Sequence, residues 1–411
     1  MSISAKTIGI ASVGGSGYLV AYIMNALRLY YFFVFAMYAV VIPHYQIFLR
    51  ASGYTPAAVG LMIGLFEIAG VLGPMMLGRL ADRTGRFREL KVLTTVLAAV
   101  AIVFLLLELP FALALLLSAV TGFLFKVSVP LTDAVAGSVL ADPREQYGKV
   151  RVYGSIGFAV AGVAVPLFSL VDDSDPYSMM VAFVASMALF AIVALLVPPP
   201  HRESSRSRES AEGPEPGNSP SGGIPTSFWI VLAAVSFGNI AFGAYNSFFS
   251  LYLKEELGVQ GVTFYWAIGA VSEIPIMFYS GRLIRRFGIG PLFVASGVIM
   301  AARLLLYATA PTIPLVILIQ TLHALTFGVM LSTGFNYVNQ STPAASRGAA
   351  MAAFNALGIG LAVFVGSVLG GVLVEALGYT GMFAVIALSP AGSAVALLLI
   401  MRNRSDLAPQ Q

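Results

Sequence analysis

The sequence predicts an all-α membrane protein of twelve transmembrane helices in two pseudo-symmetric six-helix bundles. Three observations carry this prediction: 58% of the residues are hydrophobic, only 10% are charged, and the apolar segments fall into two sets of six. Soluble domains carry about 25% charged residues, whereas a helix that crosses a hydrocarbon core of about 30 Å needs roughly 20 apolar residues. The alternating pattern of a membrane β-barrel is absent, so we expect helices to cross the bilayer.

The apolar segments define an N-terminal half over residues 26–198 and a C-terminal half over residues 226–402. The first half is predicted to contain spans 26–50, 56–80, 89–109, 111–139, 149–171 and 177–198. The second half is predicted to contain spans 227–253, 260–284, 290–310, 312–340, 345–374 and 379–401. Residues 199–225 are rich in Pro, Ser, Gly and Glu and cannot bury apolar surface, so they are expected to be a flexible linker. We expect a weakly apolar lead-in over residues 1–25 and a tail over residues 403–411.

Positive charge is sorted between the two sides of the predicted bundle. Most of the 23 Lys and Arg residues, Lys91 included, fall on the side of the termini and the linker, whereas the opposite side receives Arg50 and Lys254. Cytoplasmic loops carry the excess of Lys and Arg, so both termini and the linker are expected in the cytoplasm. The Arg-rich composition without an evident targeting peptide favours a bacterial inner membrane.

Two acidic residues lie at matching points of the two halves. Glu67 and Glu273 each stand inside an apolar span, and the same Gly-Arg-Leu sequence follows at residues 78–80 and 281–283. The two copies are about 203 residues apart, as expected for internal repeats. A carboxylate at membrane depth costs several kcal/mol unless it is paired, protonated or hydrated, so the repeated placement predicts a functional role.

Several classes of function are excluded by what the sequence lacks. It contains no Cys, its three His are far apart, and it has no G-x4-G-K-[ST] motif. We therefore expect no metal site, no cofactor and no ATP-driven transport. No nucleophile–base pattern indicates an enzyme, and the net charge of +4 reflects the sorting of loops rather than nucleic-acid binding.

The sequence from Gly78 to Arg86 resembles the signature loop of the major facilitator superfamily. That loop reads G-x-x-x-D-[RK]-x-G-[RK]-[RK], and Asp82, Arg83, Gly85 and Arg86 occupy its positions here. The resemblance implies a cytoplasmic latch, in which glycine permits a tight turn and the acid pairs with a cation or a helix N-terminus across the two halves. The alternative is a solvated, positively charged loop. The second half retains Arg285-Arg286-Phe287-Gly288 but lacks the acid.

A narrower resemblance covers most of the chain and concerns the branch of lactose, nucleoside and phenylpropionate permeases. Asp133 and the stretch from Tyr147 to Phe158 resemble spans 4 and 5 of that branch, and the sequence from Gln320 to Gly328 resembles its span 10. The resemblance implies that Asp133, Arg151 and the stacking aromatic Phe158 bind solute. It also implies a polar network in the second half, formed by Glu273, Arg303 and His323.

Two positions depart from this branch. The branch's proton-carrying acid falls on Thr326, and its span-10 lysine falls on Gln320. If transport is coupled to protons, another acid must carry the proton, and only Glu67, Asp133 and Glu273 lie deep in the spans. Burial raises the pKa of a carboxyl group toward the range where it can load and release a proton, and we favour Glu273 as the carrier, with Arg303 and His323 as modulators.

The remaining candidates are polar or aromatic side chains with two interpretations each. Lys126 shares a helix face with Asp133 and is expected either to pair with Glu67 or Asp133 or to bind an anionic solute. Tyr30 belongs to an aromatic stripe that either packs or lines the solute pathway. Asn246 is expected to bind solute or to form an interhelical hydrogen bond.

Taken together, the sequence predicts a secondary active transporter that works by alternating access. The favoured function is proton-coupled symport of a small polar organic solute: a sugar, a nucleoside or an aromatic carboxylate. Proton-coupled export of amphiphilic compounds and a non-transporting membrane sensor are the alternatives. The expected partners are the solute, the proton and the lipid bilayer, with no nucleic acid, and the family resemblance favours a monomer.

Overall fold

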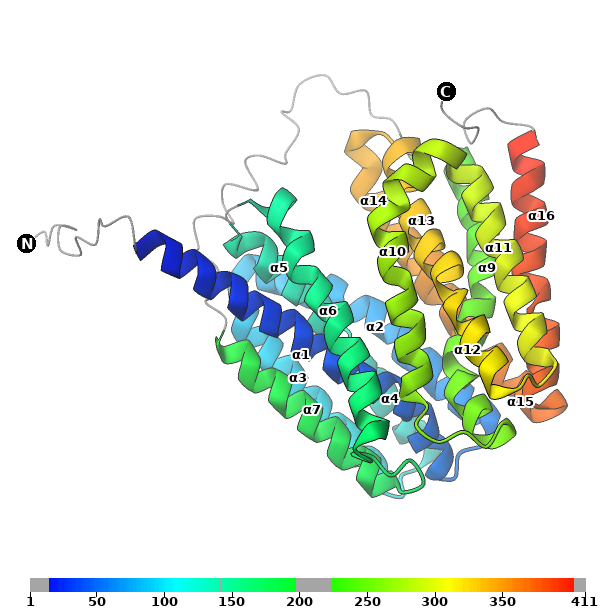
Figure 1. Cartoon of the computed structure of the whole chain (residues 1–411), viewed down its shortest axis with the longest axis horizontal. Helices are drawn as coiled ribbons and strands as arrows, with labels where there is room; N and C mark the ends of the chain where they lie inside the picture. The colour runs from blue at the N-terminus through cyan, green and yellow to red at the C-terminus, as the bar shows by residue number, and fades with distance from the viewer. Residues whose placement is uncertain (1–14, 141, 197–222, 403–411) are drawn as a thin grey trace, which may run out of the picture.

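The computed structural model describes residues 15–140, 142–196 and 223–402, and these residues form helices and loops without β-strands. The first half consists of α1 (Gly15–Ala51), α2 (Pro56–Thr84), α3 (Phe87–Val103), the short η1 (Phe104–Leu106), α4 (Phe111–Phe125), α5 (Ser128–Val139), α6 (Pro143–Leu167) and α7 (Pro176–Leu196). Figure 1 shows these helices as one bundle beside a second bundle formed by the rest of the chain.

The second half follows the same plan with more irregular helices. It consists of α9 (Thr226–Leu251), η2 (Tyr252–Glu256), α10 (Thr263–Phe287), α11 (Ile289–Ala308), α12 (Ile313–Thr321), η3 (Ala324–Gly328), α13 (Val329–Ser341), η4 (Ala344–Ser346), α14 (Arg347–Ala353), η5 (Phe354–Leu361), α15 (Ala362–Ile386) and α16 (Leu388–Arg402). Of these, η2, η3 and η5 are π-helical.

The twelve predicted spans are all found among the described residues. Ten helical segments have the length and hydropathy of a membrane span, and the last of them, Ala344–Arg402, contains two spans. Gly378 divides these two spans, because its φ of +73° leaves the helical region. The remaining span is α10, which is less apolar because it carries Glu273 and three arginines.

Two details of the first half go beyond the sequence prediction. α1 begins at Gly15, so its helix extends into the predicted lead-in 1–25. Lys91, which the sequence places with the loop cations on the side of the termini, has a side chain that is fully buried inside the first bundle. Most of the predicted linker 199–225 and the tail 403–411 lie outside the described residues.

Breaks in the helices fall at functional candidates. Pro130 lacks an N–H and excludes a regular bond to the carbonyl of Lys126, four residues earlier, so span 4 divides into α4 and α5 at Lys126. In span 10, α12 ends at Thr321 and a π-helical segment begins at Ala324, directly after His323. Broken helices of this kind place polar side chains at membrane depth.

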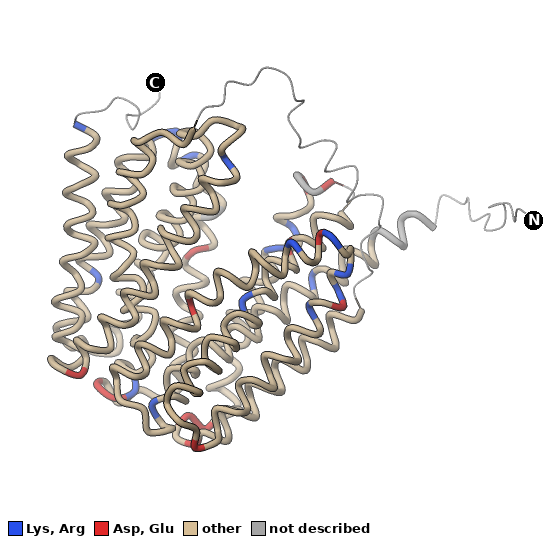
Figure 2. The backbone as a smooth tube through the Cα atoms, turned by 180° about the vertical axis from the view of Figure 1, so that it is seen from behind, with Lys and Arg blue, Asp and Glu red and all other residues tan. Residues whose placement is uncertain are grey.

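The two halves touch at one end of the bundle and separate at the other (Figures 1 and 2). The end where α1 begins and α16 stops is called the terminal end here. At the opposite end α2 packs tightly on α15, since a methyl group on Gly60 would lie 2.4 Å from the carbonyl oxygen of Ser367. At the terminal end of α2, nothing lies within 4 Å of the same position on Gly78.

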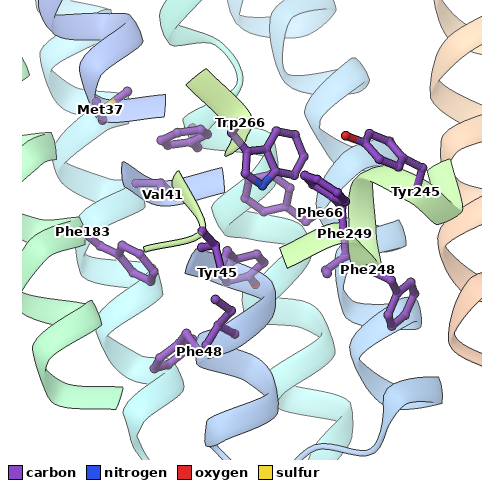
Figure 3. Packing of buried hydrophobic residues seen from close by; sticks show 14 of the residues in the cluster. Met37, Val41, Tyr45, Phe48, Phe66, Phe183, Tyr245, Phe248, Phe249 and Trp266 are labelled. Carbon is purple, nitrogen blue, oxygen red and sulfur yellow. The ribbon is translucent and has the colours of Figure 1, made fainter. Parts of the chain in front are cut away.

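Aromatic side chains from both halves form one buried cluster near the contact. Tyr45 and Phe66 of the first half belong to the same core cluster as Tyr245, Phe249 and Trp266 of the second (Figure 3). Aromatic rings bury large areas and pack edge to face or with offset stacking, which favours a dry contact at this end.

Close helix packing predicts which glycine cannot be replaced. A methyl group on Gly366 of α15 would lie 1.9 Å from the carbonyl oxygen of Ile240 of α9. Overpacking of this kind costs about 1–3 kcal/mol, so Gly366→Ala should lower the apparent Tm of the purified protein. Gly348→Ala, at a helical position with open space, is the matched control and should not lower the Tm, because alanine favours a helix more than glycine does. Equal Tm values for both variants would contradict the packing described here.

Candidate functional site

In the first half, Asp133 is held by two tyrosines and an arginine. Its Oδ1 accepts hydrogen bonds from the hydroxyls of Tyr31 (2.7 Å) and Tyr147 (3.0 Å). The Nε of Arg151 lies 3.9 Å from the same oxygen, and its guanidinium lies over the ring of Phe35, 4.2 Å from the ring centre. Helices α1, α5 and α6 therefore meet at one carboxylate.

This cluster retains hydrogen-bonding capacity for a ligand. Among the described residues, no hydrogen bond reaches Oδ2 of Asp133 or the terminal nitrogens of Arg151, and both side chains are partly exposed. A free carboxylate oxygen of Asp133 thus lies beside the guanidinium donors of Arg151 and the ring of Phe35. Such a combination recognises a ring that carries hydroxyl, amide or carboxylate groups.

A second pair in the first half joins α2 to the break in span 4. Lys126 Nζ lies 2.9 Å and 3.0 Å from the two carboxylate oxygens of Glu67. Gly70 lies one turn after Glu67. A Cβ atom at this position would lie 2.5 Å from the aliphatic part of the Lys126 side chain, so glycine leaves room for the lysine. Of the alternatives for Lys126, the described conformation contains the ion pair with Glu67, and both side chains are partly exposed.

In the second half, three helices contribute a chain of polar groups. Glu273 Oε1 of α10 lies 3.0 Å from Nε2 of His323, and Nδ1 of the same imidazole lies 3.0 Å from Nη1 of Arg303 on α11. The sequence predicted that these three residues form a network, and the structure brings them together in this order.

Arg303 is fully buried and is surrounded by neutral partners. Its Nη2 donates to Gln320 Oε1 (2.5 Å) and to the hydroxyl of Tyr245 (2.7 Å), and Tyr307 also donates to Gln320 (2.9 Å). Its Nη1 lies 3.4 Å from Thr326 Oγ1. The two positions that depart from the resembling branch, Gln320 and Thr326, therefore both bind this guanidinium.

The geometry fixes the tautomer of His323. A guanidinium carries donors only, so Nδ1 must accept from Arg303 and cannot carry a proton. The ring proton of the neutral imidazole then lies on Nε2 and is donated to Glu273. A second proton on His323 would face Arg303, whereas the described bonds of Glu273, whose side chain is 21% exposed, do not include one to Arg303.

Of the two interpretations of Tyr30, the described conformation shows packing within the first bundle. Its ring is buried against Phe190 of α7 and beneath the ammonium of Lys91, whose Nζ lies 3.8 Å from the ring centre. Lys91 also donates to Thr132 Oγ1 at 2.5 Å. Nothing in its sequence neighbourhood distinguishes this lysine from the loop cations around it.

The other predicted residues are scattered along the bundle. Phe158 is half-buried on α6, and the backbone carbonyl of Asn246 accepts a hydrogen bond from Gln46. The predicted latch lies at the terminal end, where Asp82, Arg83 and Arg86 are exposed. Gly85 ends α2 with a φ of +67°, and no ion pair of Asp82 is found among the described residues.

The sequence reasoning missed the tyrosines that hold the charged groups. Tyr31 and Tyr147 bind Asp133, Tyr245 accepts from Arg303, and Tyr307 donates to Gln320, which also binds Arg303. Their signal in the sequence is weak, because tyrosine in a span is as often a packing residue as a partner. Within the described residues, no group of three His, Asp or Glu side chains is placed to hold a metal ion.

Comparison with known proteins identifies the family. The model of the MFS_1 like family matches residues 24–385. The chain belongs to this family. It is therefore a transporter of the major facilitator superfamily rather than an enzyme, as the sequence predicted, and it is a multi-pass membrane protein.

Similar permeases carry different solutes. The chain is 28% identical to the probable 3-phenylpropionic acid transporter of Escherichia coli, over 88% of this chain and 94% of that one. It is 29% identical to the maltose permease of Geobacillus stearothermophilus, over 92% and 94%. The crystal structure of the nucleoside transporter NupG superposes with a TM-score of 0.76, at 16% identity, over 93% of this chain and all of that one. The protein is a secondary active transporter of small solutes.

The Glu67–Lys126 pair makes a double-mutant prediction. Glu67→Gln leaves a partly buried ammonium without its counter-charge and should lower the free energy of unfolding by about 1–3 kcal/mol. Adding Lys126→Met removes that charge and should restore most of the loss. Denaturation of each variant in detergent measures the coupling. Additive losses in the double variant would contradict an interaction between the two residues.

Proposed function

We propose that the protein is a proton-coupled symporter of a small polar organic solute, with Glu273 as the proton carrier. The single observation that carries this proposal is the chain from Glu273 through His323 to the buried Arg303. In it, one partly exposed carboxylate is the group that accepts a proton without loss of an arginine contact. Glu67 pairs with a lysine, and Asp133 contacts an arginine and two tyrosines. These two acids are the secondary candidates for the proton carrier.

Protonation of Glu273 changes the charge balance of the second half. The ionised carboxylate of Glu273 is the counter-charge of Arg303. The two groups are connected through the neutral imidazole of His323. When Glu273 binds a proton, the buried guanidinium loses this compensation, which is costly at membrane depth. A change of conformation that hydrates or pairs the guanidinium relieves that cost, so proton binding and movement of the two halves become linked.

The proposed solute site lies on the first half. Asp133 offers an acceptor, Arg151 offers donors, and Phe35 and Phe158 offer aromatic surface, with Lys126 close enough along span 4 to add positive charge. The similar permeases transport an aromatic acid and a disaccharide, and the structural neighbour transports nucleosides, so a ring with polar substituents is the shared chemistry. Asn246 of the second half is the proposed contact across the pathway.

The separated terminal end corresponds to an inward-facing state if the terminal end is cytoplasmic, as the distribution of Lys and Arg predicts. The exposed latch residues are then open, and closure of the terminal end would bring the Asp82 loop toward the second half. The proposed location is a bacterial inner membrane, and the proposed active unit is a monomer.

Proton movement tests the coupling. Proteoliposomes with a trapped pH dye should acidify inside when a sugar, a nucleoside or an aromatic carboxylate that the protein carries is added outside. Glu273→Gln keeps a hydrogen-bond acceptor but cannot take a proton, so acidification should fall by at least tenfold while exchange of labelled solute continues. The control is Glu108→Gln, at an exposed loop position, which should behave like the wild type.

The outcomes separate the alternatives. Solute-driven acidification that persists in Glu273→Gln would assign the proton to another acid. Proton movement opposite to solute movement would indicate export, and solute binding without any transport would indicate a sensor.

Orientation in the membrane can be tested because the chain has no cysteine. Thr84→Cys lies exposed at the terminal end, and Leu170→Cys lies exposed at the opposite end. In intact cells, a membrane-impermeant maleimide should label Leu170→Cys and should label Thr84→Cys only after lysis. Labelling in the reverse order would invert the proposed topology.

A further inference from the structure

Gln46 of α1 makes an unusual contact with the backbone of α9. Its Nε2 donates to the carbonyl oxygen of Asn246 (3.1 Å), and its Oε1 accepts from the backbone N–H of Ser250 (3.1 Å). The Gln46 side chain is only 2% exposed, and Ser250 is fully buried. One side-chain amide of the first half therefore satisfies two backbone groups of the second half.

The two backbone groups are a matched pair within α9. In a regular α-helix, the N–H of residue 250 bonds to the carbonyl of residue 246, so Gln46 binds both members of one helical hydrogen bond. Two residues further on, α9 gives way to the π-helical segment η2, Tyr252–Glu256. Gln46 therefore binds α9 at its last regular turn.

We propose that Gln46 is a gating residue of the transport cycle, an amide clip that holds the opposite end closed while the terminal end is open. This role goes beyond the proposed function, because it concerns movement of the two halves and does not depend on the coupling ion or on the solute.

The clip has a property that suits a reversible gate. When α1 and α9 separate, the N–H of Ser250 and the carbonyl of Asn246 keep each other as helical partners within α9, which is α-helical through Leu251, and the Gln46 amide reaches water. No buried polar group is left unpaired in either state, so neither state carries the penalty of an unsatisfied donor or acceptor. A contact between two apolar side chains would have no such compensation on opening.

Ion pairs flank the clip on the same surface. Arg50, one turn after Gln46, pairs with Glu255 (3.2 Å), which also accepts from Tyr379. Lys254 pairs with Asp173 of the first half (3.0 Å). Gln46 and Ser250 are 204 residues apart, the same offset as Arg50 and Lys254, so the clip lies at corresponding positions of the two repeats.

The distance between the two halves at the opposite end reports whether this end is closed or open. Leu170 of the first half and Leu377 of the second are both exposed, so cysteines at these positions can carry spin labels in the cysteine-free chain without disturbing the contact. Electron–electron dipolar spectroscopy of the full chain in lipid nanodiscs then reports the ratio of long to short distances across the opposite end.

Gln46→Glu is the decisive variant. A protonated glutamic acid has a donor and an acceptor in the positions of the amide, whereas a carboxylate has two acceptors, one of which faces the Asn246 carbonyl. Near pH 5 the distances should match those of the wild type. Near pH 9 the ratio of long to short distances should rise about tenfold over the wild type at the same pH.

Controls separate the clip from other titrations. The titratable groups described at this end include Arg50, Lys254, Glu255, Glu256, Asp173, Glu375 and His44, and the wild type measured at each pH removes their contribution. His44→Glu places a carboxylate at an equally buried position of α1 whose native ring bonds only to Val40 of its own helix. It therefore reports what a buried carboxylate near the Asp173–Lys254 pair does without the α9 contact, and its distance ratio should rise with pH less than that of Gln46→Glu.

Two results would overturn the proposal. One is a Gln46→Glu distance ratio that follows the wild type at every pH, and the other is an equal rise in His44→Glu. If Gln46→Glu does not fold, Gln46→Asn supplies the test, because it keeps an amide that is too short to reach both groups. Its ratio should exceed that of the wild type at both pH values, and an unchanged ratio would also overturn the proposal.

Discussion

The need to compensate every charge at membrane depth is the constraint on which this structure depends. A charged side chain in a span is costly unless it is paired, hydrogen-bonded or hydrated. Glu67, Asp133 and Glu273 each reach a basic residue on another helix, namely a lysine, an arginine and a histidine that leads to a second arginine. These contacts determine which helices must stay in register within each half.

The partners and the exposure of the charged side chains differ between the two halves. In the first half, Asp133 and Arg151 are partly exposed and keep atoms free for a ligand. In the second half, Arg303 is fully buried among tyrosine and glutamine partners, and only Glu273 and His323 reach solvent. This difference supports the proposal that the first half binds the solute and that Glu273 of the second half carries the proton.

The fold and the charged groups were accessible from sequence because both leave a signal in one dimension. Apolar runs of sufficient length marked every span, and rare charges inside those runs marked the candidates. Three features were not accessible from the sequence: the tyrosines that bind the charged groups, the burial of Lys91 and the packing of Tyr30 against Phe190. Each depends on the direction a side chain takes around its helix, and helical spacing alone does not say which neighbouring helix lies on that side.

The sequence by itself determined the twelve spans, the division into two repeats, the family and the identity of the ionisable groups, because hydropathy and rare residues are properties of the chain. Tertiary structure decided which groups meet. It paired Lys126 with Glu67 and fixed the tautomer of His323 through Arg303. It also brought the Gln46 amide into contact with two backbone groups of α9. These contacts join helices far apart in the chain, so only the packing of the two bundles brings their atoms within bonding distance.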